Sequence, residues 1–408
     1  MLKRPTSTIV LACALALAVV GVVALPPASS VQVVPPGTPL DVASFLPAGA
    51  SLTGNVDYTA HVQRALDAAR GRTLLLPAFP ILVNPPPGKT QCLLVNGPVR
   101  IVGTPGAELR TATPAVQLLR VQNAASVRLE SFQVRGTGGI GRRLAHGLVQ
   151  LWRCEDVLVR GVTVSDADAD GLAIADSSDV RIESCTVVRG SKAGLYLSNC
   201  SGAVVAGNVV RDCVGHVASN GLTVGSGILL LSNVDLVCSS NVVVGGVGPG
   251  ILCGSNDAQR ATDGVLIANN RIRGCANVAN PATSGGIQLA NVQPEHRTHV
   301  VVAHNSIRSC GLNGIVVDNH DGAVIQGNVI EDSWMSAISV GHSIGVRIED
   351  NTIVDGNESG ASGQAAVYLQ AHARGCVARG NLVVSLARPA LTPLLDRAPP
   401  GTNLTSAP

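Results

Sequence analysis

The stretch Gly171 to Val210 decides the fold, because it states one pattern twice. It reads Gly-Leu-Ala-Ile-Ala-Asp at 171–176 and Asp-Val-Arg-Ile-Glu-Ser-Cys-Thr-Val at 179–187. The second copy reads Gly-Leu-Tyr-Leu-Ser-Asn at 194–199 and Gly-Ala-Val-Val-Ala-Gly-Asn-Val-Val at 202–210. The two copies are 23 residues apart, so the chain repeats itself with that period.

The same frame extends over most of the chain. One position of the repeat falls at Phe132, Val162, Cys185, Asn208, Asn241, Asn270, Asn305, Asn328, Asn351 and Asn381. The steps between these positions are 30, 23, 23, 33, 29, 35, 23, 23 and 30 residues, so every departure from 23 is an insertion. A fixed period with insertions is typical of a solenoid, whose repeats bury their apolar faces by stacking.

Each repeat has the periodicity of strands. Apolar residues alternate at Leu172/Ile174, Leu195/Leu197 and Val180/Ile182, and Gly, Ser, Asn and Asp separate the short runs. An inward Asn can hydrogen-bond the backbone and the equivalent amides above and below it. We therefore predict an all-β fold, a single-stranded parallel β-helix of about ten coils with an internal asparagine ladder.

The composition agrees with this fold. Hydrophobic residues make up 46% of the 408 residues but aromatic residues only 2%, and there are 45 Gly, which favours a solenoid filled with Val, Ile and Leu. The formal net charge of +2 becomes 0 without Lys3 and Arg4. No basic patch then indicates binding of nucleic acid or an anionic membrane.

The ends of the chain suggest export. Residues 1–30 read as a signal peptide, with Lys3 and Arg4 before an apolar run from Ile9 to Leu25. An uncleaved anchor is the alternative, because that run is near the lower limit for spanning a bilayer. We expect a secreted, periplasmic or surface protein with no transmembrane segment in the mature chain. Residues 31–56 form a leader, 57–112 a capping helix and first coils, 113–385 the repeats, and 386–408 a C-terminal cap or tail.

A helix is expected before the repeats. Asp57 can cap residues 58–70, which place Val62, Leu66 and Ala69 on one face, and Gly71 ends the run. One amphipathic helix before a solenoid serves as a lid, because it covers the open strand edge of the first coil.

The cysteines have the phases of buried residues. Cys185 takes the asparagine position, and Cys238, Cys253 and Cys376 fall on inward strand positions. A further site holds Cys213, Cys275 and Cys310, where other coils have Gly190, Gly246, Ser333 and Gly356. We expect small buried thiols. One bridge, between Cys275 and Cys310 of adjacent coils, is geometrically open.

The N-terminal segments carry a family resemblance. Asn55-Val-Asp-Tyr-Thr-Ala, Thr73-Leu-Leu-Leu-Pro and Val99-Arg-Ile-Val-Gly, with the later repeats, resemble the pectate-lyase-like superfamily of right-handed parallel β-helices. The resemblance covers residues 50–385 and implies right-handed winding. It is weak for activity, because that superfamily includes lyases, hydrolases, epimerases, phage tailspikes and non-catalytic proteins.

Insertions mark a first candidate site. Residues 135–146 and 211–226 enlarge the turn before the Gly-Leu strand, and long loops on a rigid scaffold are where binding sites are built. The predicted catalytic residues are Asp168, Asp170, Arg189, Lys192 and His216. The predicted substrate-binding residues are Arg143, His146, Trp152 and Tyr196.

Asp166, Asp168 and Asp170 precede Gly171 as Asp-x-Asp-x-Asp-Gly, the head of a calcium loop. Ser177 stands where an EF-hand has Glu, so either a different type of calcium site or a solvated acidic turn is possible.

The resemblance gives two opposing indications of chemistry at this turn. Asp168-Ala-Asp-Gly is similar to the Asn-Thr-Asp-Gly segment of polygalacturonases, which would make Asp170 an acid. The next coil has Gly190-Ser-Lys where those enzymes have Gly-Asp-Asp, so the second carboxylate that glycoside hydrolysis needs is missing. β-Elimination of a polyuronate instead needs a cation on the sugar carboxylate and a base, for which Lys192, Arg189 or His216 is a candidate.

A second candidate site gathers Glu295, His296, Asp318, His320 and His342 on neighbouring coils. Gln293-Pro-Glu-His resembles the Asp-Pro-His-Asp/Glu motif of mannuronan C5-epimerases, with Gln in place of the first Asp. Three histidines with Asp318 can alternatively hold zinc.

Three function classes remain open: an enzyme on acidic polysaccharide, with a calcium-assisted polyuronate lyase ahead of a hydrolase or epimerase; a non-catalytic glycan-binding protein; and a structural β-helix. Outward Leu229, Leu231 and Val316 hint at the last class.

Overall fold

The computed structural model describes residues 38–139, 147–213, 216–217, 223–255, 262–276, 284–291, 299–357, 359, 364–386 and 392–405. At 216–217 and 223–224 only the backbone is described. The predicted signal peptide lies outside these residues. Among the residues described, no helix is long and apolar enough to cross a membrane.

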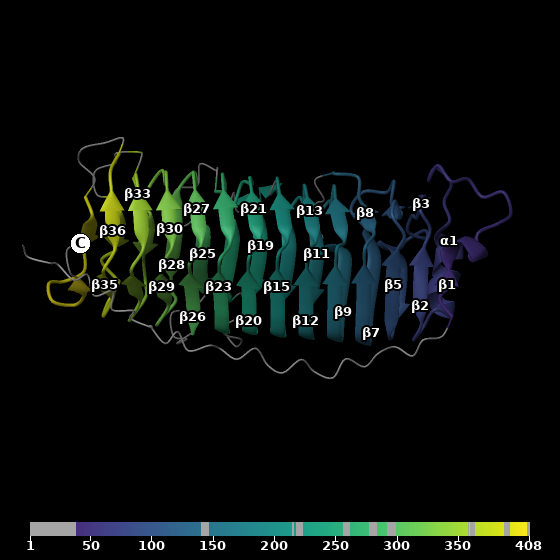
Figure 1. The fold of residues 1–408 in the computed structure, drawn as a ribbon, viewed down its shortest axis with the longest axis horizontal. Helices are drawn as coiled ribbons and strands as arrows, with labels where there is room; N and C mark the ends of the chain where they lie inside the picture. Colours follow the sequence, from purple (N-terminus) through teal and green to yellow (C-terminus); the bar gives the residue numbers. More distant parts are fainter. Residues whose placement is uncertain are drawn as a thin grey trace, which may run out of the picture. The chain divides into compact units, whose positions relative to one another are not determined.

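The described chain winds through three columns of short parallel strands, one strand of each column per coil (Figure 1). The first face contains β4(Gln91–Asn96), the first half of β7(Gln117–Glu130) and of β9(Gly147–Arg160), β11(Asp170–Ala175), β14(Ala193–Ser198), β19(Ser226–Leu231), β22(Ile251–Ser255), β25(Gly285–Asn291), β28(Asn313–Asp318), β31(Ile338–Val340), β34(Val367–Leu369) and β37(Leu394–Asp396). The second face contains β1(Leu40–Asp41), β2(Thr73–Leu76), β5(Val99–Gly103), the second halves of β7 and β9, β12(Ser178–Glu183), β15(Ser201–Ala206), β20(Val234–Ser239), β23(Asp263–Ala268), β26(Val300–Ala303), β29(Val324–Gln326), β32(Arg347–Glu349), β35(Val377–Arg379) and β38(Leu404–Thr405).

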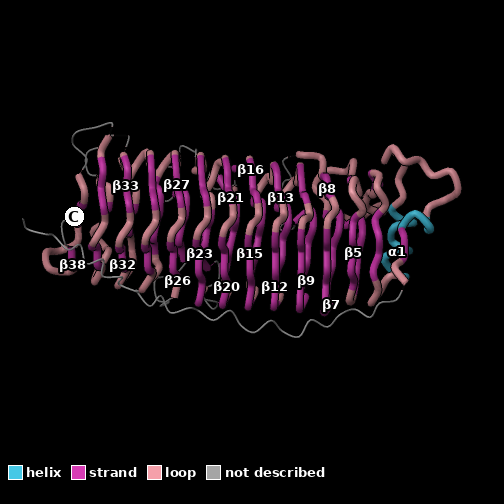
Figure 2. Tube along the Cα trace, viewed as in Figure 1, coloured by secondary structure: helices cyan, strands magenta, loops and turns pink. Residues whose placement is uncertain are grey.

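The third face is a separate sheet (Figure 2). It contains β3(Pro80–Leu82), β6(Glu108–Arg110), β8(Gln133–Arg135), β10(Thr163–Ser165), β13(Thr186–Val188), β16(Val209–Arg211), β21(Val242–Val244), β24(Arg271–Arg273), β27(Ser306–Arg308), β30(Val329–Glu331), β33(Thr352–Val354) and β36(Leu382–Val384). A small antiparallel pair, β17(His216–Val217) and β18(Thr223–Val224), lies in the insertion before β19.

The register confirms the repeat. Leu172 pairs with Leu195 and Leu195 with Ile228, while Ile182 pairs with Val205 and Val205 with Cys238. Residues in phase therefore lie beside one another, about 4.8 Å apart, and their apolar side chains fill the interior. This is the predicted parallel β-helix.

The asparagine ladder runs unbroken through seven coils. The Nδ2 of each Asn donates to the Oδ1 of the Asn on the next coil at 2.9–3.0 Å, from Asn208 through Asn381. Each Oδ1 also accepts from the backbone nitrogen of the preceding Asn. Cys185 begins the series, because its backbone nitrogen donates to Asn208. The ladder satisfies buried backbone groups at a turn between the second and third faces.

Left-handed residues make the turns. The residue before the ladder position has positive φ in every coil, at Ser131, Gly161, Ser184, Gly207, Ser240, Asn269, His304, Gly327, Asp350 and Gly380. Short polar residues and Gly tolerate this conformation best. This requirement accounts for the Gly, Ser, Asn and Asp between the short strands.

In three coils a small glycine of a first-face strand faces a larger cysteine in the interior. A Cβ on Gly194, Gly250 or Gly286 would lie 3.0, 3.3 or 2.8 Å from the Sγ of Cys213, Cys275 or Cys310, respectively. In a later coil the strand position is Ala337 and its neighbour is Gly356. In these three coils the cysteine side chain thus occupies space that a larger strand residue than Gly would need. All ten described cysteines are buried and free, including Cys275 and Cys310.

The helix α1(Thr59–Ala68) closes the N-terminal end, as Figure 2 shows. Asp57 accepts from the backbone nitrogen of Thr59, and Val62, Leu66 and Ala69 are buried as predicted. The side chain of Gln63 exchanges two hydrogen bonds with the backbone of Leu94 in β4, at 2.8 and 2.9 Å. Gln63 thereby pairs the backbone N–H and C=O of Leu94, which this edge strand would otherwise leave without partners. A short 3-10 helix, Val42–Phe45, precedes α1. At the other end the coils continue past residue 385 with β37 and β38.

Candidate functional site

The three acidic residues of the turn before β11 bind three different sets of partners. Asp166 has positive φ and accepts from Arg189 Nε at 2.6 Å, with Arg135 Nε at 3.4 Å. The hydrogen bond from Arg189 holds the pKa of Asp166 below its ordinary value. Asp166 therefore joins two neighbouring coils on the side of the third face.

Asp168 points toward the preceding coils. Its carboxylate accepts from the backbone nitrogen of Ala115 at 2.7 Å and from the hydroxyl of Thr137 at 2.9 and 3.0 Å. Only 3% of the residue is exposed. By accepting from these donors, the buried carboxylate anchors two loops. It is too buried to contact a substrate, so the structure gives no support to the predicted catalytic role of Asp168.

Asp170, Lys192 and Tyr196 form one cluster at the first face. Asp170 is fully buried, accepts from the backbone nitrogen of Ala193 at 3.0 Å, and lies 3.5 Å from Lys192 Nζ. The same ammonium lies 5.1 Å from the centre of the Tyr196 ring. The Lys192 side chain is 23% exposed. The cluster therefore presents one cation, fixed between a carboxylate and an aromatic ring, to the surface.

Arg189 does not belong to that cluster. It is engaged by Asp166, which raises the pKa of its guanidinium. Arg189 therefore stays a cation, and among the predicted bases it is the least suited to accept a proton.

Trp152 shares the first face but not the Lys192 cluster. Register places Trp152 beside Ala175, in the row next to that of Tyr196. Its Nε1 donates to Asp176 at 2.9 Å, and the guanidinium groups of Arg120 and Arg153 lie 5.1 and 4.2 Å from its ring centre. Two guanidinium groups already lie within cation–π distance of the ring, which limits it as a platform for sugar.

A polar groove that the sequence did not indicate lies beside Trp152. It is an open depression of about 600 Å³ where the first face turns into the second, lined by Arg153, Cys154, Glu155, Asp176, Ser177, Ser178, Asn199 and Ser201. Its residues come from turns of three coils. The repeat frame aligns those turns, but no composition signal distinguishes them from other turns.

Five predicted site residues cannot be placed by their side chains. Arg143, His146, Glu295 and His296 lie outside the described residues, and His216 is described only as backbone in β17. Within the described part of the chain, no group of three or more His, Cys, Asp or Glu side chains is arranged to hold a metal ion. The carboxylates of Asp166, Asp168 and Asp170 accept from three different sets of donors and do not converge on one point. Calcium at these residues stays a prediction to which this arrangement gives no support.

The second candidate site divides in two. Asp318 ends β28 and its Oδ1 accepts from the backbone nitrogen of His342 at 3.0 Å and contacts the ring Nδ1 at 3.1 Å. His320 is instead fully buried, and burial lowers its pKa to about 4. Its backbone nitrogen donates to Ser343 Oγ at 3.0 Å, in a turn position that faces the interior. His320 therefore has a structural position, and Asp318, His320 and His342 do not form a metal-holding group in the described part of the chain.

One histidine was missed at this place. The ring of His372 stacks on that of His342, with centres 4.6 Å apart and planes 14° apart. His372 lies 30 residues after His342, and the local repeat step from Asn351 to Asn381 is also 30. The repeat frame could thus have placed the two rings side by side.

The comparisons address the fold. A family model for the right handed beta helix region matches residues 121–272 and 260–388. The chain belongs to the right-handed β-helix family. The fold expected from the resemblance to the pectate-lyase-like superfamily is therefore confirmed.

Solved structures resemble this β-helix protein at low sequence identity. A mannuronan C-5 epimerase A-module from Azotobacter vinelandii is 16% identical with a TM-score of 0.58, over 90% of this chain and 100% of that one. The family 28 exopolygalacturonase of Yersinia enterocolitica is 12% identical with a TM-score of 0.60, over 90% and 78%. The adhesin PfbA of Streptococcus pneumoniae is 14% identical with a TM-score of 0.60, over 86% and 92%. The search of curated proteins gave no match. At these identities the likeness concerns the fold.

Proposed function

We propose that this β-helix protein binds an acidic polysaccharide outside the cell, with Lys192 and Tyr196 as the first-face contact. The observation that carries the proposal is the partly exposed Lys192 ammonium, held 3.5 Å from Asp170 and 5.1 Å from the Tyr196 ring. An ammonium attracts the carboxylate of a uronic acid, and a tyrosine ring offers an apolar surface to the sugar. Asp170 fixes the position of the ammonium.

Three further facts support this ligand class. Two of the similar structures, the mannuronan epimerase and the exopolygalacturonase, are named for uronic acid polymers, and the third is named a surface adhesin. The formal charge of 0 without Lys3 and Arg4 leaves no basic patch, which argues against nucleic acid as the ligand. The predicted signal peptide would bring the chain to where such polysaccharides occur.

The test is calorimetric titration with oligosaccharides of pectate, alginate and glycosaminoglycans. Lys192→Met is expected to weaken binding of an acidic oligosaccharide about tenfold, which corresponds to about 1.4 kcal/mol. Lys192→Arg keeps the charge and is expected to retain most of the affinity. Tyr196→Ala should also weaken binding. The proposal fails if the folded protein binds none of the three polymers, or if Lys192→Met binds as tightly as the parent.

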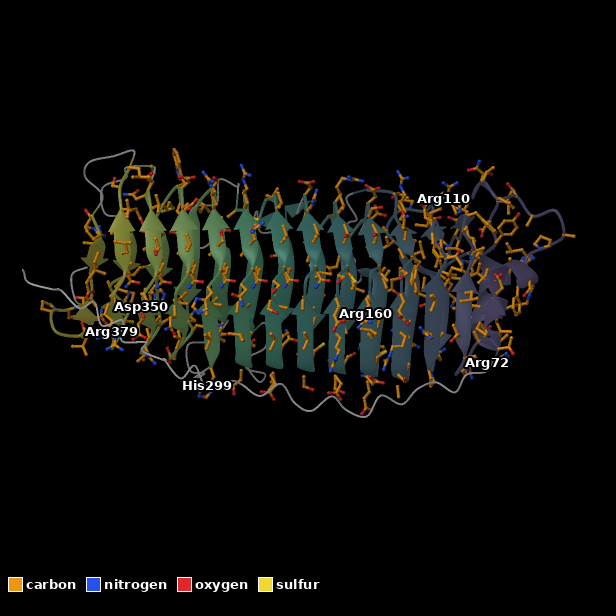
Figure 3. All side chains as sticks on the ribbon, viewed as in Figure 1. Arg72, Arg110, Arg160, His299, Asp350 and Arg379 are labelled. Carbon is orange, nitrogen blue, oxygen red and sulfur yellow. The ribbon has the colours of Figure 1, made fainter. Side chains whose placement is uncertain are left out.

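A structural role receives less support from the first face. Of the three residues that hinted at an outward apolar strip, Leu229 and Val316 are only 7% and 4% exposed, and Leu231 is half-buried. The outward apolar row lies on the second face instead, at Val204, Val237, Leu266, Val301 and Val324. Paired charges flank it, including Arg160 with Glu183 and Arg379 with Glu349. Figure 3 labels the two arginines.

The second candidate function is β-elimination of a polyuronate. Lys192 favours it, because a fixed cation can neutralise the sugar carboxylate and acidify the neighbouring C–H bond. His216 is the predicted base. Incubation with pectate or alginate, with and without calcium, should then release products that absorb ultraviolet light. No absorbance with any polyuronate, together with retained binding, would leave the protein as a binding module.

A further inference from the structure

The stacked pair of His342 and His372 is not part of the Lys192 cluster. The two rings come from successive coils, and both follow first-face strands: β31 ends at Val340 and β34 ends at Leu369. Their centres are 4.6 Å apart and their planes are nearly parallel. The His342 side chain is 55% exposed and His372 is also exposed. Two imidazoles are thus held together at the surface.

Asp318 fixes one of the rings. Its Oδ1 accepts from the backbone nitrogen of His342 at 3.0 Å and lies 3.1 Å from the ring Nδ1. Because an ionised carboxylate has no hydrogen to donate, the Nδ1–H is the donor of this second contact. A Cβ on Gly341 would lie 2.5 Å from that same oxygen. Gly341 therefore leaves the space through which the carboxylate reaches the ring. With Nδ1 as a donor, the Nε2 of His342 is the atom that gains a proton.

The same pairing occurs once more without the stack. Asp263 Oδ1 lies 2.9 Å from both the backbone nitrogen and the Nδ1 of His299. The His299 side chain is 85% exposed, and no second ring stacks on it among the described residues. An aspartate bound to the next coil's histidine is therefore a turn device of this fold. What distinguishes His342 is its aromatic neighbour.

The charged groups around the rings are otherwise engaged. On the preceding coil, Asp321 accepts from the backbone nitrogen of Ile344 at 2.7 Å. On the following coil, Asp396 accepts from Asn403 and Ala398, and Arg397 lies 5.6 Å from the Tyr368 ring. Arg374 follows His372 by two residues and is exposed. Within the described residues, no carboxylate forms an ion pair with His372.

We propose that His342 and His372 form a protonation-dependent binding site for an anionic group of an acidic polysaccharide, either a carboxylate or a sulfate. The inference rests on the proposed function for the identity of the ligand, and the site itself is separate from Lys192. Asp318 balances one protonated ring. A proton on the second ring places two like charges 4.6 Å apart, and a bound anion offsets their repulsion. Anion binding and proton uptake therefore favour each other.

The site predicts a specific dependence on pH. Each ring gains a positive charge when it is protonated, and positive charge attracts an anion. Affinity of the site for an anion should therefore be higher at about pH 5.5 than at about pH 8. In a Lys192→Met background the residual affinity for an acidic oligosaccharide should rise roughly fivefold or more over that fall in pH.

The first experiment is calorimetry of oligogalacturonate binding to Lys192→Met, in buffers with different ionisation enthalpies. Binding at about pH 6.5 is expected to take up a fraction of a proton, up to about one. His372→Gln and His342→Gln should remove both this uptake and the pH dependence. His299→Gln is the matched control and should keep them. Equal losses in the His299→Gln control, or affinity that does not depend on pH, would overturn the proposal.

The second experiment separates this proposal from the proposed function. Galacturonate and inorganic sulfate are titrated into the full chain while the histidine ring resonances are followed by NMR. Both anions should shift the His342 and His372 signals at about pH 5.5 and leave them unchanged at about pH 8. Absence of these shifts contradicts the histidine site even if polymer binding through Lys192 is found. Shifts without any polymer binding would support the site and contradict the proposed function.

Discussion

The side-chain amide of Asn241 donates to the Oδ1 of Asn270, 2.9 Å away on the next coil. The backbone nitrogen of Asn241 donates to the same oxygen at 3.0 Å, and Asn270 Nδ2 donates to the backbone oxygen of Cys238 at 2.9 Å. Asn270 is 1% exposed. One side chain therefore satisfies three buried groups of the preceding coil.

Asn270→Ala should destabilise the fold by about 2–3 kcal/mol, because it leaves buried donors and an acceptor without partners. The measurement is the free energy of unfolding from denaturant titration. Asn269→Gly is the control: Asn269 is exposed with a φ of 57°, which Gly adopts freely. The control should change stability by less than about 0.5 kcal/mol. Similar losses in both variants would contradict a special role of the ladder.

Gly286→Ala tests the packing of Gly against cysteine. The new Cβ would lie 2.5 Å from Ile307 Cγ2 and 2.8 Å from Cys310 Sγ. Overpacking of this kind typically costs about 1–3 kcal/mol. Adding Cys310→Gly should recover part of the loss, because it reproduces the Ala337 and Gly356 combination of a later coil. A double variant less stable than Gly286→Ala alone would show that the thiol does not limit the space.

The acid limit of stability should depend on Arg189. The hydrogen bond from Arg189 lowers the pKa of Asp166 in the folded chain. The stabilisation is therefore complete above the unfolded value of about 3.9 and is lost as the pH falls through the lower folded value. Arg189→Gln should raise the Asp166 pKa and move the midpoint of acid unfolding to higher pH. Arg181, exposed and without an ion pair among the described residues, provides the control Arg181→Gln, which should not move it.

The thiols should be inert in the folded protein. Burial raises the pKa of Cys213 and Cys238 to about 12. A thiol reagent added to native protein at neutral pH should therefore label almost no cysteine, since the thiolate is the reactive form. After denaturation without reductant, every cysteine of the chain should react. A protected pair in the denatured protein, with a mass two hydrogens lower, would indicate a bridge such as Cys275 to Cys310.

Lys192 and Asp170 should be coupled in stability. Lys192→Met leaves the fully buried carboxylate without its cation, and the expected cost is about 2 kcal/mol. Adding Asp170→Asn should cost less in the Lys192→Met background than in the parent, because the charge that needed a partner is gone. Denaturant unfolding of the four proteins gives the coupling energy. Additive losses would mean that the 3.5 Å contact has no energetic weight.

The repeat predicted the fold because the position of a residue within its repeat decides whether its side chain points into the β-helix or out of it. The asparagine ladder from Asn208 to Asn381 and the alternation of Leu172 with Ile174 follow from a spacing that recurs along the chain. The lid helix follows from its own apolar spacing. The predicted end of the helix was two residues late, at Arg70 instead of Ala68, because Ala69 and Arg70 already belong to the turn before Gly71.

The candidate site was less predictable because it depends on side-chain direction. Asp166, Asp168 and Asp170 alternate in the sequence as calcium ligands do, yet the positive φ of Asp166 turns the chain between them, and they meet an arginine, a threonine and a lysine. Lys192 and Tyr196 were predicted separately, as base and sugar contact, and the structure brings them together. The sequence could not show that the guanidinium group of Arg153 lies over the Trp152 ring, which the prediction of a sugar contact there had assumed to be open.

Each asparagine from Asn208 to Asn351 offers the same acceptor to the coil before it and the same donor to the coil after it. Such a joint is directional and interchangeable, so copying a whole 23-residue unit, such as 313–335, would renew the joint it interrupts. Gene duplication can therefore lengthen this protein in steps of one coil. The loss of half a unit would instead shift the following strands out of register with the preceding coil.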